Sequence, residues 1–136
     1  TMALVEWSPD YSVQVQEFDL HHQKLIGYIN ELNDSMRQGK GKAQLPEILR
    51  KLVDYTGYHF EREEELMEAH HFQGLAAHKE EHRILVEKIR SFQRDFSLGR
   101  VALSLEILHF LRDWLLHHIL ETDKEYGPFL KDKGVS

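Results

Sequence analysis

Apolar residues recur every three or four positions along four long stretches of the chain, which is the repeat of one buried face of an α-helix. The repeat predicts helices over about residues 19–38, 46–71, 75–96 and 101–126. The joins between them are short, so each helix is expected to lie against its neighbour in sequence. The pattern therefore predicts an all-α fold, an antiparallel up-down-up-down four-helix bundle.

Capping and turn residues set the expected boundaries of these helices. Asp19 is predicted to be the N-cap of the first helix, and Pro46 suits the first turn of the second. Turns and helix ends are expected at Gly39-Lys40-Gly41-Lys42, Gly74, Gly99 and Gly127-Pro128. The chain is thus expected to form a single domain over residues 1–136, with an extended N-terminal arm (1–18), a bundle (19–126) and a tail (127–136).

Composition and charge narrow the function classes. A formal charge of -6 over 136 residues argues against nucleic acid or an anionic membrane as the main partner. The chain has no cysteine, which excludes disulfides, thiolate zinc sites and iron–sulfur clusters. No apolar run approaches the roughly 18 residues of a membrane span, and a cytoplasmic location is expected. One feature of the composition stands out, a total of ten histidines.

Helical phase sorts these histidines into two sets. Five are predicted to lie on the apolar faces of the helices, namely His22, His59, His78, His82 and His118. The other five are predicted to lie at the sides, at a helix end or in solvent, namely His21, His70, His71, His109 and His117. His78 and His82 are one turn apart, about 6 Å, which suits two ligands of one metal ion. Such a pair alone is more often two core histidines, but three other helices also carry inward histidines.

Two carboxylates are candidates for the same site. Glu63 follows His59 by one turn on the same face. It could instead be an exposed member of the acidic run 61–65, but its phase with His59 favours a ligand. Asp123 follows His118 by five residues, which on a regular helix places it about 140° away. Asp123 is therefore either a surface residue or is brought inward by a π-type turn, and spacing alone leaves both alternatives open.

The size of this donor set restricts the metal. Five imidazoles and one or two carboxylates exceed the four ligands of a tetrahedral zinc ion. They suit two six-coordinate metals that prefer nitrogen and oxygen ligands, iron first. If both carboxylates and an oxide or hydroxide bridge the two metals, the metal with three histidines is saturated. The metal with two histidines keeps one open position, enough for one small molecule bound end-on.

Four motifs in this order make the sequence similar to the hemerythrins, and among them to the bacterial type, from about Trp7 to Tyr126. The motifs are Asp19-x-x-His22, His59-Phe60-x-x-Glu63, His78-x-x-x-His82 and Trp114-Leu115-x-x-His118-Ile119-x-x-x-Asp123. The resemblance implies a non-haem di-iron centre that binds O₂ reversibly, for oxygen storage, delivery or sensing, and not an enzyme. It also implies that small anions such as azide enter the oxidised form.

The resemblance further implies a role for each residue. His78, His82 and His118 would hold the saturated iron, and His22 and His59 would hold the open one. Glu63 and Asp123 would bridge the two irons. Trp114 and Leu115 match residues beside the O₂ pocket of the family, although both could equally be ordinary core residues.

Two alternative functions share parts of this pattern. A ferritin-like oxidase or a peroxidase-type di-iron enzyme needs inward Glu-x-x-His motifs on two helices. The chain has Glu68-x-x-His71 and Glu106-x-x-His109, but helical phase places both outside the core. The other alternative is an O₂- or redox-sensing domain of a larger signalling protein, in which the arm at 1–18 would be either a mobile element or a lid on the bundle.

Overall fold

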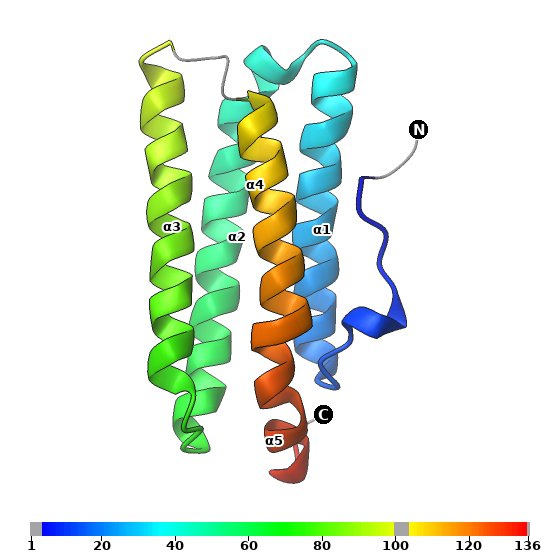
Figure 1. Ribbon diagram of the computed structural model, residues 1–136, viewed down its shortest axis with the longest axis vertical. Helices are drawn as coiled ribbons and strands as arrows, with labels where there is room; N and C mark the ends of the chain where they lie inside the picture. Colours follow the sequence, from blue (N-terminus) through cyan, green and yellow to red (C-terminus); the bar gives the residue numbers. More distant parts are fainter. Residues whose placement is uncertain (1–3, 100–103, 136) are drawn as a thin grey trace.

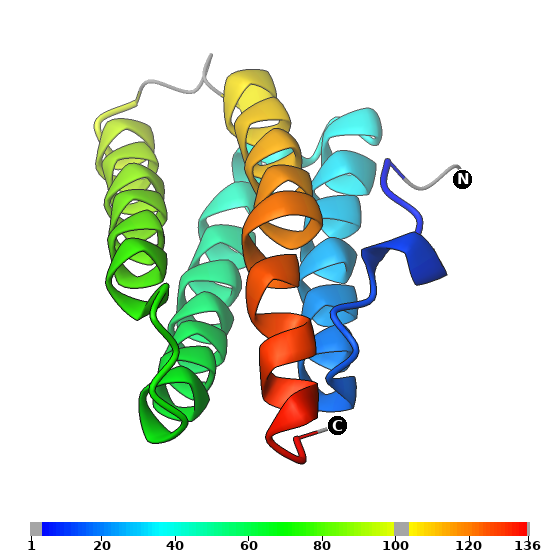
Figure 2. The same cartoon turned by 60° about the horizontal axis from the view of Figure 1, so that its bottom comes forward.

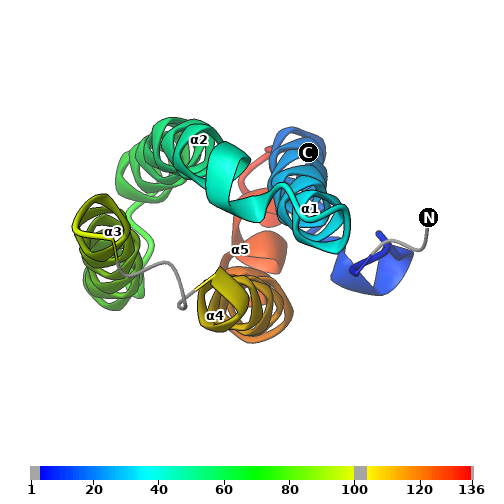
Figure 3. The ribbon, with the colours of Figure 1, turned by 90° about the horizontal axis from the view of Figure 1, so that it is seen from above.

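Four long helices form an antiparallel bundle in the computed structural model, which describes residues 4–99 and 104–135 (Figure 1). They are α1 (Gln16–Arg37), α2 (Gly41–Ala69), α3 (Leu75–Ser97) and α4 (Ser104–His117). Viewed from above, the four helices surround a shared interior (Figure 3). The fold class predicted from the apolar repeat is confirmed. The expected start of the fourth helix, near Val101, lies outside the described residues.

The arm and the start of α1 differ from the expectation. The helix begins at Gln16, and Asp19 is not its N-cap. The carboxylate of Asp19 instead accepts hydrogen bonds from the hydroxyl of Ser12 (2.6 Å) and the backbone N–H of Val13 (2.8 Å). The side chain that was expected to cap the helix therefore ties the arm to the first turn of α1.

The rest of the arm runs along α1 and contains one 3₁₀ turn, Pro9–Tyr11 (Figure 1). The backbone N–H of Val5 donates to Oδ1 of Asn30 (3.0 Å), and Nδ2 of Asn30 donates to the carbonyl of Val5 (2.8 Å). Val13 and Val15 are buried. These contacts attach the arm to the bundle at both ends of its described length.

Helix α2 begins earlier than predicted, so that Pro46 lies inside the helix and not in its first turn. The turn before it is shorter than expected and is centred on Gly39, whose φ of +74° is in the left-handed region. Ser35 of α1 donates its hydroxyl hydrogen to Gln44 (2.5 Å), which holds the first turns of α2 against α1. Pro46 is exposed, and its missing N–H removes one helical hydrogen bond near the N-terminal end of α2.

The chain also stays helical beyond the predicted stop at Gly127-Pro128. After a π-helical turn (His118–Thr122) and a 3₁₀ turn (Asp123–Glu125), α5 spans Tyr126–Asp132. Pro128 is in the first turn of α5, where its missing N–H is not needed. A Cβ on Gly127 would lie 2.2 Å from the carbonyl oxygen of Val13, so glycine allows α5 to touch the arm. The helix lies at the lower end of the bundle (Figure 2).

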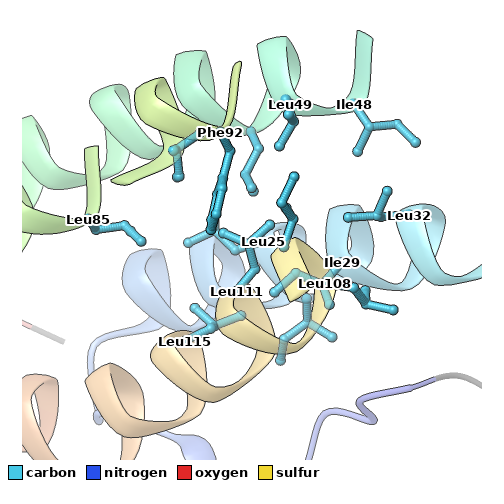
Figure 4. Packing of buried hydrophobic residues seen from close by; sticks show 14 of the residues in the cluster. Leu25, Ile29, Leu32, Ile48, Leu49, Leu85, Phe92, Leu108, Leu111 and Leu115 are labelled. Atoms are coloured by element: carbon cyan, nitrogen blue, oxygen red, sulfur yellow. The ribbon is translucent and has the colours of Figure 1, made fainter. Parts of the chain in front are cut away.

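Two apolar clusters fill the interior. The larger joins all four long helices in the upper part of the bundle, and Figure 4 shows its residues pointing toward one another, among them Leu25, Leu85, Leu111 and Leu115. The smaller cluster lies near α5 and is built from Val13, Val15, Phe18, Met67, Tyr126 and Leu130. Among the described residues, no helix is long and apolar enough to cross a membrane. The cytoplasmic location expected from the sequence stays a prediction.

Candidate metal centre

A layer of buried polar side chains separates the two apolar clusters. On α1, His22 lies between Phe18 of the smaller cluster and Leu25 of the larger one. On the other helices too, the inward histidines lie between apolar residues of the same buried face. All five histidines predicted to point inward are buried, with at most 3% of any of them exposed: His22, His59, His78, His82 and His118. Helical phase therefore predicted this set correctly.

The two candidate carboxylates are in the same layer. Glu63 and Asp123 are both 0% exposed. The chain forms a wider, π-helical turn directly before Asp123. In this turn the backbone N–H of Asp123 donates to the carbonyl of His118, five residues back. This i→i+5 bond brings Asp123 to the same side of the helix as His118, with its Oδ1 at 2.8 Å from Nε2 of that histidine. Of the two alternatives left open by spacing, the structure has the π-type turn.

The seven side chains form two overlapping groups. One consists of Glu63, His78, His82, His118 and Asp123, and the other of His22, His59, Glu63 and Asp123. Within each group the candidate ligand atoms lie within 4.8 Å of one another. Three histidines are thus gathered on one side and two on the other, and both carboxylates belong to both groups.

The buried polar atoms of this layer suit cations. Among the described residues, Nε2 of four of these histidines, Oε1 of Glu63 and Oδ2 of Asp123 are buried without a well-aligned hydrogen bond, and they face one another only at ion-pair distances, such as Nε2 of His22 at 2.8 Å from Oδ2 of Asp123. Burying imidazole nitrogens and carboxylate oxygens with incomplete hydrogen bonding is costly, and metal ions would supply the missing interactions. Imidazole nitrogens with carboxylate oxygens are a donor set that iron binds well. The residues present therefore fit the di-iron centre that the resemblance implied.

The electrostatics lead to the same conclusion. Burial alone raises the pKa of Glu63, but His59, His118 and His82 outweigh burial and hold the pKa well below its usual value. For His118 burial lowers the pKa, yet the attraction of Asp123 and hydrogen bonds to carboxylates raise it well above its usual value. Burial and the charge of Glu63 raise the pKa of Asp123, but His118 and His22 outweigh them and hold it below its usual value, so both carboxylates stay ionised in the core.

Carboxylates outside the layer support two of the histidines. Nδ1 of His82 is 2.7 Å from Oε2 of Glu64, and Nδ1 of His118 is 2.9 Å from Oε1 of Glu81. Thr122 donates its hydroxyl hydrogen to Glu81 as well (2.9 Å). The pattern of residues in the sequence did not single out Glu64 and Glu81. Both are acidic residues next to a predicted ligand in the sequence. Such a residue cannot be told from the sequence alone to accept a hydrogen bond from a histidine or to face solvent.

His21 corrects another expectation. It was predicted to point to the side or into solvent, but only 6% of it is exposed and its Nδ1 is 2.8 Å from Nδ1 of His59. Helical phase correctly placed the side chain of His21 at the side of α1. That side is not exposed to solvent, because α2 covers it. Burial and the neighbouring His59 lower the pKa of His21 to about 4.

Aromatic rings and apolar side chains close the upper side of the layer. Phe60 stacks on His82 with ring centroids 3.6 Å apart, and Trp114 stacks on His118 at 4.4 Å. Leu115 is buried, and together with Trp114 and Leu25 it lines a cavity of about 20 Å³. Apart from Thr56, the lining of this cavity is apolar.

The structure does not bring the remaining candidates to the layer. The side chains of both Glu-x-x-His motifs are exposed: Glu68, His71, Glu106 and His109. His117 is also exposed and pairs with Glu121 at 3.1 Å. The donor arrangement of a ferritin-like oxidase is therefore absent from the described part of the chain, as helical phase predicted.

Comparison with known proteins identifies the family. A model of the hemerythrin HHE cation binding domain matches residues 13–130. The chain belongs to the hemerythrin family. It is 34% identical to a bacteriohemerythrin of Methylococcus capsulatus (strain Bath), over 95% of this chain and 98% of that protein. It is 29% identical to a myohemerythrin of Theromyzon tessulatum, over 89% of each chain.

Solved hemerythrin structures agree with this assignment. A crystal structure of a wild-type hemerythrin superposes with a TM-score of 0.86 at 33% identity, over 93% of this chain and 97% of that one. Family membership and the clustered donors confirm the main prediction from the sequence, O₂ binding at a non-haem di-iron centre.

Proposed function

We propose that this hemerythrin is a reversible O₂ carrier whose three-histidine group holds one iron and whose two-histidine group holds the other. In this assignment His78, His82 and His118 bind the first iron, and His22 and His59 bind the second. Glu63 and Asp123 bridge the pair. The observation that carries the proposal is that both carboxylates, and no histidine, belong to both groups.

The second iron would be the one that binds O₂, because the two-histidine group offers one donor fewer. When bound, the iron pair supplies the electrons and the open coordination position that O₂ requires. The protein supplies an apolar approach: Leu25 and Leu115 are each three residues from a predicted ligand, and both line the small cavity above the layer. An apolar wall favours an uncharged molecule over water and anions.

A carrier suits the donor set better than an oxidase or a peroxidase. Five neutral imidazoles with two carboxylates bring less negative charge to the metals than the glutamate-rich sites of ferritin-like oxidases. Less donated charge stabilises highly oxidised iron less, so O₂ is expected to be bound and released and not consumed. The described arm is bonded to α1 at Val5 and at Val13, which gives no support to a sensor with a mobile arm.

A metal assay combined with optical spectra tests the proposal. The purified protein should contain two irons per chain, and its spectrum should change on adding air to the reduced form and return when O₂ is removed. Glu63→Gln should lower the iron content, because it takes charge from both groups. Glu61→Gln, an exposed neighbour, is the matched control. One zinc per chain in material grown with ample iron, or a spectrum that does not return, would contradict the proposal.

A further inference from the structure

His21 lies outside the predicted ligand set, yet it touches one ligand directly. Its Nδ1 is 2.8 Å from Nδ1 of His59. A hydrogen bond between two identical ring nitrogens needs a hydrogen on one and a lone pair on the other. Only one of the two rings can therefore carry a hydrogen on Nδ1 while this contact is made.

The direction of the bond follows from the proposed function, on which this inference rests. If Nε2 of His59 is a metal ligand, the neutral ring carries its hydrogen on Nδ1. His59 then donates and His21 accepts. The hydrogen of His21 is on its own Nε2, which lies 3.7 Å from Oε2 of Glu17. Glu17 is in turn held by Arg62, whose Nε is 2.8 Å away.

Aromatic neighbours hold the ring of His21 in this position. Its centroid is 5.7 Å from that of Phe18, 5.8 Å from that of Tyr55 and 5.3 Å from that of Tyr58. These rings come from both α1 and α2. The accepting nitrogen is therefore fixed by packing on two sides and not only by the bond that it makes.

The support of His59 differs in charge from the support on the other side of the layer. His82 and His118 face the carboxylates of Glu64 and Glu81. A carboxylate acceptor draws on an imidazole N–H more strongly than a neutral ring and makes the histidine a more electron-rich ligand. Among the described residues, Nδ1 of His22 has no hydrogen-bond partner at all. The two-histidine side thus lacks the charged support present on the three-histidine side.

We propose that His21 is a positioning residue, which holds His59 with Nε2 toward the metal and keeps the two-histidine position the electron-poorer of the two. A neutral acceptor fixes the ring as firmly as a carboxylate would, without adding its charge. The two-histidine position therefore favours the reduced metal more than the three-histidine position does.

Three substitutions separate the two parts of this role in the iron-loaded protein. His21→Phe keeps a ring but removes the acceptor, and iron should be lost to a chelator about 10- to 100-fold faster. His21→Gln offers a neutral oxygen acceptor and should restore retention close to that of the wild type. His21→Glu offers a charged acceptor, so it should retain iron and lower the midpoint potential of the centre. Tyr58→Phe, which keeps a ring beside His21 and removes only the hydroxyl of an exposed side chain, is the control and should behave as the wild type.

The outcomes that overturn the proposal are equally defined. They are wild-type iron retention in His21→Phe, release from His21→Gln as fast as from His21→Phe, or an unchanged midpoint potential in His21→Glu. If His21→Phe does not fold, the iron retention of His21→Gln and the midpoint potential of His21→Glu decide whether the proposal holds. The wild type shows which proposal has failed. If it holds two irons and binds O₂ reversibly while the variants match it, only the role of His21 is wrong, whereas a wild type without iron overturns both.

Discussion

The hydroxyl of Tyr126 in α5 donates a hydrogen bond to Oε2 of Glu63 in α2, and both side chains are completely buried. Burial, and after it the charges of Asp123 and Glu63, raise the pKa of Tyr126 well above its usual value, so the phenol keeps its hydrogen. Tyr126, which is 63 positions from Glu63 along the chain, thus donates a hydrogen bond to one oxygen of this predicted bridging carboxylate. The other oxygen, Oε1, faces the histidines.

Tyr126→Phe should destabilise the metal-free protein by about 1–3 kcal/mol, because a buried carboxylate oxygen loses its donor while the ring volume stays the same. Urea unfolding monitored by circular dichroism measures the difference. Tyr28→Phe is the control, since Tyr28 is half-buried and no described hydrogen bond joins it to a predicted ligand. Equal losses in the two variants would show that the bond to Glu63 contributes nothing specific.

His78→Ala should lower the iron content below two per chain while the helical circular dichroism stays close to that of the wild type. Nε2 of His78 lies 2.7 Å from Oδ1 of Asp123 inside the three-histidine group, so its loss removes one donor. His109→Ala, an exposed histidine on α4, should keep both irons. Full iron content in His78→Ala would remove this residue from the ligand set.

Removal of iron should lower the melting temperature, on the order of 10–20 °C if the metal binds strongly, because bound metal stabilises only the folded chain. Without metal, buried imidazole nitrogens and carboxylate oxygens of the layer are left with incomplete hydrogen bonding. Much helix should survive, since the two apolar clusters do not depend on iron. Thermal melts of the iron-loaded and stripped protein provide the test, and superimposable curves would contradict it.

Leu115→Ala should leave the iron content unchanged, because leucine supplies no ligand. It should cost about 2–5 kcal/mol of stability if the enlarged cavity stays empty, and less if water enters. Leu115 lies three residues before His118, about 60° round the same face. Autoxidation of the oxygenated protein should become faster, and azide should enter the oxidised site sooner, both followed by absorbance. Wild-type rates for both would mean that Leu115 is only a core residue.

The fold and most of the site were predictable because both follow from one repeat. Apolar residues at helical spacing locate the buried faces, and polar residues in the same phase, such as His59 and Glu63, are then placed without knowledge of the tertiary structure. Asp123 is the exception. Its position depends on where the helix changes its hydrogen-bonding pattern, and the five-residue spacing from His118 allowed two alternatives.

The errors have a common physical origin in contacts between elements. The phase of His21 gives its direction relative to α1 only, and that direction turned out to face His59 of α2. The first turns of α2 contact α1 through the bond from Ser35 to Gln44, which the repeat within α2 does not reveal. Gly127 was interpreted as a helix end, but it is glycine because the backbone of Val13 passes close to it. Periodicity within one segment carries no information on its neighbours.

The π-helical turn at His118–Thr122 has a consequence beyond the placement of Asp123. One extra residue in a turn shifts the helical frame of everything that follows, by about 100° relative to a continuous α-helix. Asp123, Tyr126 and Leu130 all face the interior in the shifted frame. Deleting a single residue from the turn would rotate all three outward together and bring Pro128 to the place of Gly127 beside Val13. A length change of one residue would therefore undo the metal layer and the closure of the lower end of the bundle at the same time.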